Sequence, residues 1–199
     1  MSKRQDAVVV VVCKAPEPGR VKTRLAREIG DDKALRVYAL MMAALFANLG
    51  ASSIYDVCPC VDGNINLVHA GTVDAIKQHG LTLGDRLCNA ILECGDYGKK
   101  IVIGSDTPNI TSDIIHQAIN ALGSSDVVIG PAADGGYYLI GMNKLHESIF
   151  HDISWSTDAV FSETCRRIES AGLTYDVLPV MRDIDTLEDL NAVMPELLS

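Results

Sequence analysis

The sequence has few positive charges and lacks any long hydrophobic run. Its 199 residues contain 17 Lys and Arg against 26 Asp and Glu, which gives a formal net charge of −9. This acidic balance argues against nucleic-acid binding, because nucleic-acid-binding domains are usually basic. No stretch approaches the length of apolar sequence that crosses a bilayer, so we expect no membrane span. The apolar run 7–13 follows Lys3 and Arg4 but precedes no small-residue cleavage site, so we expect a cytoplasmic protein.

The six cysteines and five histidines lack the spacings of the common metal and nucleophile sites. Cys58 and Cys60 flank a single proline, which differs from the two-residue spacing of a zinc knuckle or a redox pair. A chain of this length, with 48% hydrophobic residues, has little need of disulfides, so we expect reduced structural thiols. The scattered histidines suggest no metal site, and no Ser-His-Asp or Cys-His arrangement is recognisable.

Apolar, β-branched runs alternate with segments of helical spacing along the chain. The run 7–13 is typical of a strand buried on both faces. Further strands are expected at 53–60, 99–106, 125–132 and 173–180, whereas the segment 135–142 either pairs with the preceding strand or extends the sheet. This alternation predicts an α/β fold with a mainly parallel central sheet. Without a linker, repeat or low-complexity segment, we expect one domain over residues 1–199.

Helix boundaries are indicated by capping residues and glycines. The segment 25–49 has apolar residues at helical spacing in its second part, with Asp31 or Asp32 as the expected N-cap. Ser156 or Thr157 is expected to open a helix that runs to about Ser170. Further helices are expected at 84–95, at 112–122 after Thr111, and after Thr186, which forms a predicted capping box with Asp189.

A cationic loop follows the first predicted strand. Ligands of such sheets bind beyond the carboxyl ends of the strands, so this loop belongs to the candidate site. It has one glycine, and Pro16 and Val21 stand where a P-loop needs glycines, so neither a dinucleotide fingerprint nor a P-loop is present. A turn stiffened by proline and glycine that presents long cations can bind a di- or triphosphate. The predicted phosphate-binding residues are Lys14, Gly19, Arg20, Lys22, Thr23 and Arg24.

Acidic residues follow three other predicted strands. Asp106 ends the strand at 99–106, Asp134 follows the strand at 125–132, and Asp183 and Asp185 follow the strand at 173–180. Mg²⁺ typically takes one or two protein carboxylates and fills its other positions with phosphate oxygens and water. Asp106 in a turn and Asp185 as a helix cap are the structural alternatives. Cations at one strand end and acids at others are the composition of a site for a phosphate ester with a divalent metal.

The segment GPAADGGYYLIG, residues 130–141, places glycines around one acid. Paired glycines such as Gly135 and Gly136 let the backbone approach a ligand closely, and Asp134 could accept hydrogen bonds from sugar hydroxyls. A tight β-turn is the alternative interpretation. Trp155, the only tryptophan, is either a core residue or a platform on which a sugar stacks.

Five segments together resemble, in order, the signature segments of a bacterial protein family. This family is classed with the glycosyltransferases and was formerly called a domain of unknown function. The five segments are KAPEPGRVKTRL (14–25), IGSDTP (103–108), GPAADGGYYLIG (130–141), ISWST (153–157) and DIDTLEDL (183–190). The likeness runs from about Val8 to Leu190. It implies a three-layer, Rossmann-like GT-A fold, the fold of nucleotide-diphospho-sugar transferases, with a nucleotide in the crevice and a divalent cation, Mg²⁺ or Mn²⁺.

The resemblance also implies a metal site. Asp106 would take the place of the metal-binding acid in the fold's Asp-x-Asp motif, but Pro108 replaces the second acid. A second ligand must therefore come from elsewhere. Asp185 is the expected one, because acids in similar segments serve this role in several nucleotidyltransferases of the fold, and Asp183 is its alternative.

Sugar transfer from a nucleotide-diphospho-sugar is the function that the resemblance favours. Lys22, Asp106 and Asp134 are the expected catalytic residues, with Asp134 orienting or deprotonating a small acceptor, and Asp134, Gly135, Gly136 and Trp155 are expected to bind the sugar or the acceptor. The density of cations favours nucleotidyl transfer from a nucleoside triphosphate as the alternative, and a non-catalytic nucleotide-sugar sensor is more remote. The base, the sugar, the acceptor and the oligomeric state, a homodimer included, stay open.

Overall fold

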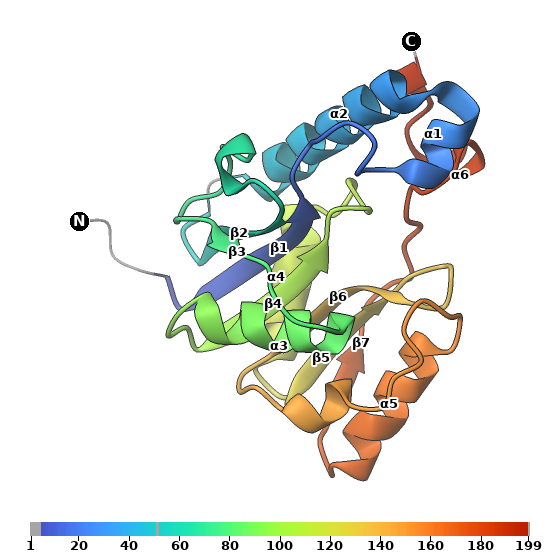
Figure 1. The fold of residues 1–199 in the computed structure, drawn as a ribbon. Helices are drawn as coiled ribbons and strands as arrows, with labels where there is room; N and C mark the ends of the chain where they lie inside the picture. Colours follow the sequence, from blue (N-terminus) through green and yellow to red (C-terminus); the bar gives the residue numbers. More distant parts are fainter. Residues whose placement is uncertain (1–4, 51, 199) are drawn as a thin grey trace.

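A seven-stranded sheet runs through the computed structural model, which describes residues 5–50 and 52–198 (Figure 1). The strand order is β3-β2-β1-β4-β6-β5-β7. β6 is antiparallel to both of its neighbours, and every other adjacent pair is parallel. The strands are β1 (Ala7–Lys14), β2 (Tyr55–Asp62), β3 (Ile76–Lys77), β4 (Lys99–Gly104), β5 (Val127–Pro131), β6 (Tyr137–Met142) and β7 (Tyr175–Val177).

Helices cover both faces of this sheet and make three layers. The α-helices of the described residues are α1 (Thr23–Ile29), α2 (Asp31–Leu49), α3 (Leu83–Glu93), α4 (Ser112–Ala121), α5 (Val160–Ser170) and α6 (Leu187–Val193). Short 3-10 helices follow at η1 (Ile65–Leu67), η2 (Glu147–Phe150) and η3 (Pro195–Leu198). The prediction of an α/β fold with a mainly parallel sheet is confirmed.

The side chains of β1 alternate between the two faces of the sheet and pack against the helices on each face. Val9 and Val11 belong to a core cluster that includes residues of α2 and α4, whereas Val8 and Val10 belong to a cluster with residues of α3 and α5. Successive side chains of a strand point to opposite faces, so an unbroken run of valines fills both cores. The strand is buried on both faces, as its composition predicts.

The segment 25–49 forms two helices, and the predicted N-cap is wrong. Gly30 lies between α1 and α2 with φ of 87° and is the N-cap of α2. Glycine adopts this conformation at low cost and lets the chain turn sharply between the helices. Asp31 and Asp32 therefore lie in the first turn of α2, where a negative charge interacts favourably with the helix dipole.

Helix α5 begins later than predicted. Ser156 has φ of 66°, a left-handed conformation that an α-helix cannot include, and Ala159 is the N-cap. The hydroxyl of Thr157 donates to the carbonyl of Ser154 at 2.7 Å and accepts from the amide of Ala159 at 3.3 Å. It stabilises a turn and leaves the helix to start at Val160. The capping box of Thr186 and Asp189 at α6, in contrast, is confirmed.

The strand order places a crevice at the carboxyl ends of β1 and β4. The chain runs from β1 to β2 and β3 on one side, then returns to place β4 on the other side of β1. Such a reversal opens the crevice in which ligands of α/β sheets bind. Within the described residues, no helix combines the length and the apolar character that crossing a bilayer requires.

Candidate active site

A cleft of about 410 Å³ opens at the carboxyl ends of β1, β2 and β4. Cationic and acidic side chains share its walls, since each of these strands is followed by polar residues. The charged residues that line it are Lys14, Lys22, Arg24, Arg86, Asp62, Asp106 and Asp185. Of the predicted phosphate-binding residues, Lys14, Lys22, Thr23 and Arg24 lie here.

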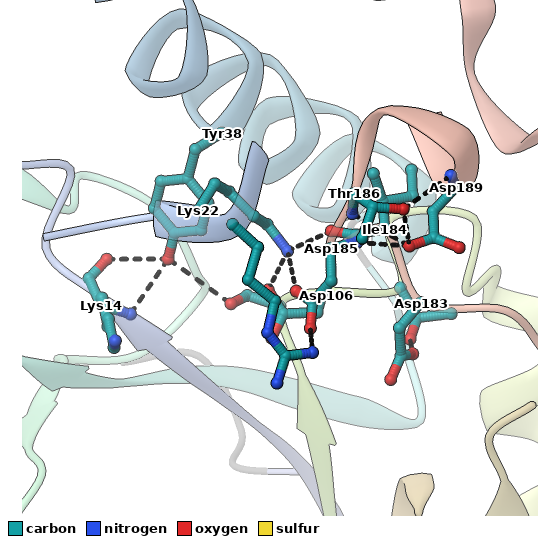
Figure 2. A network of polar contacts seen from close by, with 12 residues as sticks. Lys14, Lys22, Tyr38, Asp106, Asp183, Ile184, Asp185, Thr186 and Asp189 are labelled. Carbon is teal, nitrogen blue, oxygen red and sulfur yellow. Dashed lines mark hydrogen bonds and ion pairs between the residues drawn. The ribbon is translucent and has the colours of Figure 1, made fainter. Parts of the chain in front are cut away.

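Lys22 is the buried centre of the cleft (Figure 2). Its ammonium bonds to Oδ1 of Asp106 and to the carbonyl of Ile184, and it lies 3.2 Å from Oδ1 of Asp185. The side chain is only 2% exposed. The backbone has φ of 46° and ψ of 45° at the N-cap of α1, a conformation that non-glycine residues adopt rarely. This turn directs the side chain inward, so Lys22 is not the exposed loop cation that its sequence position suggests.

Asp106 and Asp185 meet at this ammonium because two connections are tied together. The amide of Ile184 donates to the carbonyl of Asp106 at 2.8 Å, which joins the end of β4 to the segment before α6. The amide of Asp185 donates to Oδ2 of Asp189 at 3.2 Å, so the capping box of α6 also fixes this segment. Both carboxylates are about half exposed, at 50% and 45%, and therefore remain open to the cleft.

Tyr38 fixes the backbone at the end of β1. Its hydroxyl donates to the carbonyl of Lys14 at 2.9 Å, accepts from the amide of Lys14 at 3.0 Å, and lies 3.4 Å from Oγ of Ser105 (Figure 2). Burial raises the pKa of this phenol far above its usual range. The hydroxyl thus joins α2 to the ends of β1 and β4 while the Lys14 side chain stays exposed.

The remaining predicted loop residues lie outside the walls of the cleft. Arg20 forms an ion pair with Glu17 at 2.9 Å and lies 4.0 Å from Asp62, and its side chain is 55% exposed. Gly19 has φ of 71°, which a tight turn requires, and open space surrounds the position of an added Cβ. The structure gives both residues a part in shaping the loop.

Asp183 lies beside this pair of acids but faces a second cavity. Its carboxylate accepts a hydrogen bond from the hydroxyl of Thr107, which is buried. Burial raises the pKa of Asp183 to about 6, the Thr107 hydroxyl opposes the shift, and the charges of Asp106, Asp134 and Asp185 add to it. Asp183 does not contact Lys22, so it lies apart from the point on which Asp106 and Asp185 converge.

The glycine-rich segment forms the turn between β5 and β6. Oδ1 of Asp134 accepts from the amide of Gly136 at 2.9 Å. Gly135 has φ of 90°, and a Cβ there would lie 2.3 Å from the backbone oxygen of Asp158. Close packing against the segment before α5 therefore requires this glycine. The amide of Ala133 donates to the carbonyl of Met181 at 2.8 Å, which places the turn beside the segment that leads to Asp183.

Trp155 lies away from the cleft. It lines a different cavity of about 670 Å³ beside α3, together with Gly84 and Phe150. Its ring meets Tyr137 edge to face, with 6.4 Å between the ring centroids. The structure therefore packs the tryptophan against the core cluster under α3 and does not bring it together with Asp106 or Lys22.

Five polar residues of the cleft do not appear among the predicted site residues: Tyr38, Asp62, Gln78, Arg86 and Ser105. Three of them lie together on the side of β2 and α3. Asp62 ends β2, Gln78 follows β3, and Arg86 extends from α3. Arg86 donates to Gln78 at 3.1 Å and lies 3.8 Å from Asp62, so the three form one group. The position of Asp62 after a strand could have indicated it. Nothing in the sequence brings Arg86 to the same place.

The chain resembles proteins of known structure and one described family. The family model of uncharacterized proteins conserved in bacteria (DUF2064) matches residues 48–157. A crystal structure from Desulfovibrio desulfuricans G20, provisionally named a nucleotide-diphospho-sugar transferase, is 32% identical, with a TM-score of 0.88 over 94% of this chain and 86% of that one. The search of curated proteins found no match.

More distant structures share the fold. CMP:2-keto-3-deoxy-manno-octonic acid synthetase, complexed with CTP, is 14% identical with a TM-score of 0.59, over 96% of this chain and 99% of that one. The manganese complex of Rv0371C from Mycobacterium tuberculosis H37Rv is 13% identical with a TM-score of 0.58, over 97% and 100%.

The sheet order, the cleft at its carboxyl edge and these likenesses define an enzyme with the nucleotide-diphospho-sugar transferase fold. The chain belongs to the bacterial family DUF2064.

Proposed function

We propose that this enzyme is a metal-dependent glycosyltransferase that takes its sugar from a nucleotide-diphospho-sugar. One observation carries the proposal. Asp106 and Asp185 converge on one point at the carboxyl edge of the sheet, and the cations Lys14, Lys22 and Arg24 line the same cleft. A diphosphate needs cations for its charge, and a divalent metal needs carboxylates that are open to solvent. The cleft offers both.

The residues at this point fit a small divalent cation. Three oxygens, from Asp106, Asp185 and the carbonyl of Ile184, already surround a positive charge, which is the ammonium of Lys22. Carboxylate and carbonyl oxygens are the ligands that Mg²⁺ and Mn²⁺ prefer. Within residues 5–50 and 52–198, no cluster of three or more His, Cys, Asp or Glu side chains is arranged to hold a metal. We therefore propose that Asp106 and Asp185 hold the cation and that phosphate oxygens of the donor complete its shell.

A metal bound there would supply positive charge to the leaving diphosphate. The chain's own cations do the same, and Lys22 is the most important of them. In this conformation its ammonium neutralises the two carboxylates. We propose that it turns to the diphosphate when the donor binds, while Lys14 and Arg24 hold the outer phosphate oxygens. A preorganised set of charges of this kind stabilises the transition state more than water can.

The proposed reaction is displacement at the anomeric carbon of the donor sugar. An acceptor hydroxyl oxygen forms a bond to this carbon while the bond from the carbon to the diphosphate oxygen breaks. The diphosphate leaves with the electron pair, and the acceptor proton passes to a carboxylate of the site. Asp134 is the proposed acceptor-orienting group, because the turn that carries it is bonded to the segment that leads to Asp183.

Nucleotidyl transfer is the second candidate function. It is favoured by the number of cations in the cleft, since a triphosphate carries more charge than a diphosphate. In that reaction an anionic acceptor attacks the α-phosphorus of a nucleoside triphosphate and pyrophosphate leaves. The two candidates thus differ in the substrate that the cleft selects and in the charge of the acceptor.

A thermal-shift screen separates the two candidates. Nucleotide-diphospho-sugars and nucleoside triphosphates of each base are compared with Mg²⁺, with Mn²⁺ and with a chelator. A ligand that binds only the folded state raises the free energy of unfolding by RT ln(1 + [L]/Kd), so at equal concentration tighter ligands give larger shifts. We expect the largest shifts with a nucleotide-diphospho-sugar plus metal. A consistent preference for triphosphates would favour nucleotidyl transfer, and the absence of any metal-dependent shift would contradict the proposal. The screen is repeated with Asp106→Asn, which removes a proposed metal ligand. Asp74→Asn, which removes an exposed charge outside the cleft, is its control.

A further inference from the structure

A second cavity of about 230 Å³ adjoins the cleft. The two share Val12, Leu83 and Asp106 as wall residues, so Asp106 faces both. The second cavity extends from this shared wall between β4, β6 and the start of α3. A molecule bound there would lie next to the predicted metal ligand, on the side away from Lys22. The second cavity is also smaller than a typical site for a drug-sized ligand, so it suits a single small group.

The walls of this cavity are mainly apolar. Leu87, Val102, Ile103, Tyr137, Tyr138 and Ile140 line it. The polar groups at its edge are partly engaged already, since Tyr138 donates to the carbonyl of Pro179 at 3.1 Å and Thr107 donates to Asp183. A sugar has hydroxyls around its ring and requires partners on most sides, because buried polar groups without hydrogen bonds are costly. The cavity therefore suits an apolar body better than the donor sugar.

Every charged side chain that lines the second cavity is negative. These are Asp106 and Asp183, and no Lys, Arg or His lies among the described residues of its wall. The cations are in the adjoining cleft, where Asp106 and Asp185 engage the Lys22 ammonium. A phosphate or carboxylate in the second cavity would meet like charges, which disfavours its binding there.

From these observations we propose that the second cavity binds the acceptor, and that the acceptor is an uncharged molecule with an apolar body and a hydroxyl group. The hydroxyl lies toward Asp106 and Asp183, and Asp183 accepts a hydrogen bond from it; Asp134 does not line this cavity, so Asp183 takes the orienting role there. That the bound molecule is the acceptor rests on the proposed glycosyl transfer. That the cavity selects uncharged molecules does not depend on that proposal. Nucleotidyl transfer to a phosphate ester is disfavoured on the same grounds, because no cationic side chain among the described residues lines this cavity to bind its anionic acceptor.

Methyl-labelled NMR spectra test this inference directly. The probes are benzyl alcohol and benzyl phosphate, which share the same apolar body and differ in charge. We expect benzyl alcohol to shift the methyl resonances of Leu87, Val102 and Ile140. Benzyl phosphate should bind at this place at least about tenfold more weakly, a difference of about 1.4 kcal/mol. The spectra are recorded with the cleft filled by Mg²⁺ and the nucleoside diphosphate that gives the largest thermal shift, so that the cations there are occupied.

Asp183→Asn provides the matched variant. Asparagine keeps an oxygen that can accept from Thr107 but removes the charge, so the affinity of benzyl phosphate relative to benzyl alcohol should rise about tenfold. Asp74→Asn, which removes a charge outside both cavities, should change neither. The inference is overturned if benzyl phosphate shifts the three methyl groups as strongly as the alcohol, or if neither compound shifts them.

The inference and the proposed function fail in different ways. If no nucleotide binds but benzyl alcohol still shifts these methyl groups selectively, the glycosyltransferase proposal fails and the charge selectivity of the cavity stands. If nucleotide-sugars bind but the methyl groups respond equally to both probes, the proposed function stands and the acceptor class is wrong.

Discussion

The ammonium of Lys22 lies 3.2 Å from Oδ1 of Asp185, which is 163 positions away in the sequence. The same ammonium bonds to Asp106, so one buried cation joins the loop after β1, the end of β4 and the segment before α6 (Figure 2). This relationship places a positive charge at the point where we propose that a metal binds. It has consequences for stability and for metal affinity.

Replacing Lys22 should change both properties. Lys22→Met keeps the apolar stem and removes the ammonium, which leaves Asp106 and Asp185 close together without a counter-charge. We expect the free energy of unfolding in metal-free buffer to fall by about 1–3 kcal/mol. We also expect Mn²⁺ to bind the nucleotide-free variant more tightly than the wild type, because no ammonium competes for the oxygens. Urea denaturation and calorimetry measure the two effects. Weaker Mn²⁺ binding by the variant would show that the ammonium does not occupy the metal position.

Arg24 should contribute to nucleotide binding without contributing to folding. Its side chain is 72% exposed and lies 3.8 Å from Asp185 at the wall of the cleft. Arg24→Ala should weaken binding of a nucleoside diphosphate by about 1.5–3 kcal/mol, the contribution of a charge-assisted hydrogen bond. Arg27→Ala removes an exposed cation from the same helix outside the cleft and should bind normally. Equal losses in the two variants would mean that only the general field of the helix matters.

The fold follows from local patterns in the sequence, whereas the centre of the site depends on a turn that these patterns do not reveal. The valine run of β1 and the capping box of α6 are readable because burial and capping require those residue types. The cations of the first loop are equally visible as a group. The inward direction of Lys22 is not, since it depends on a left-handed backbone at a lysine, where tertiary contacts override local preference. Arg86 reaches the cleft from α3 only because that helix packs beside β1.

Asp183 should make stability depend on pH. Its pKa is raised from 3.8 to about 6 in the folded chain, so the folded state keeps a proton that the unfolded state releases. The stability contributed by this proton is present at low pH and is lost as pH rises through about 6. As pH rises from about 4 to about 7, the wild type should lose up to about 3 kcal/mol of unfolding free energy relative to Asp183→Asn. Urea denaturation of both proteins at the two pH values, with a chelator present, measures this change. A difference that is independent of pH would contradict the partly buried position of this carboxyl group.

The two glycines of the β5–β6 turn should respond differently to substitution. A Cβ at Gly135 would lie 2.3 Å from the oxygen of Asp158, and the backbone has φ of 90°. Gly135→Ala should therefore lower the free energy of unfolding by about 2 kcal/mol or more. At Gly136 a Cβ would lie 3.1 Å from a side-chain oxygen of Asp134, so Gly136→Ala requires only a small shift of that carboxylate. Thermal denaturation of the two variants gives the comparison, and equal destabilisation would mean that the contact with Asp158 is not what requires the glycine.

The metal–nucleotide site is tested most directly by calorimetry of Mn²⁺ with and without a nucleoside diphosphate. The titration uses wild type, Asp106→Asn, Asp185→Asn and the control Asp74→Asn. We expect weak metal binding to the wild type alone and much tighter binding once phosphate oxygens complete the shell. Asp106→Asn should abolish this coupling while the fold is preserved, because the amide is nearly isosteric with the carboxylate. If Asp185→Asn alone has no effect, Asp183 or Asp134 is the second ligand and the rest of the account holds. If Asp106→Asn binds the metal and the nucleotide as the wild type does, the metal-dependent mechanism proposed for this cleft is wrong.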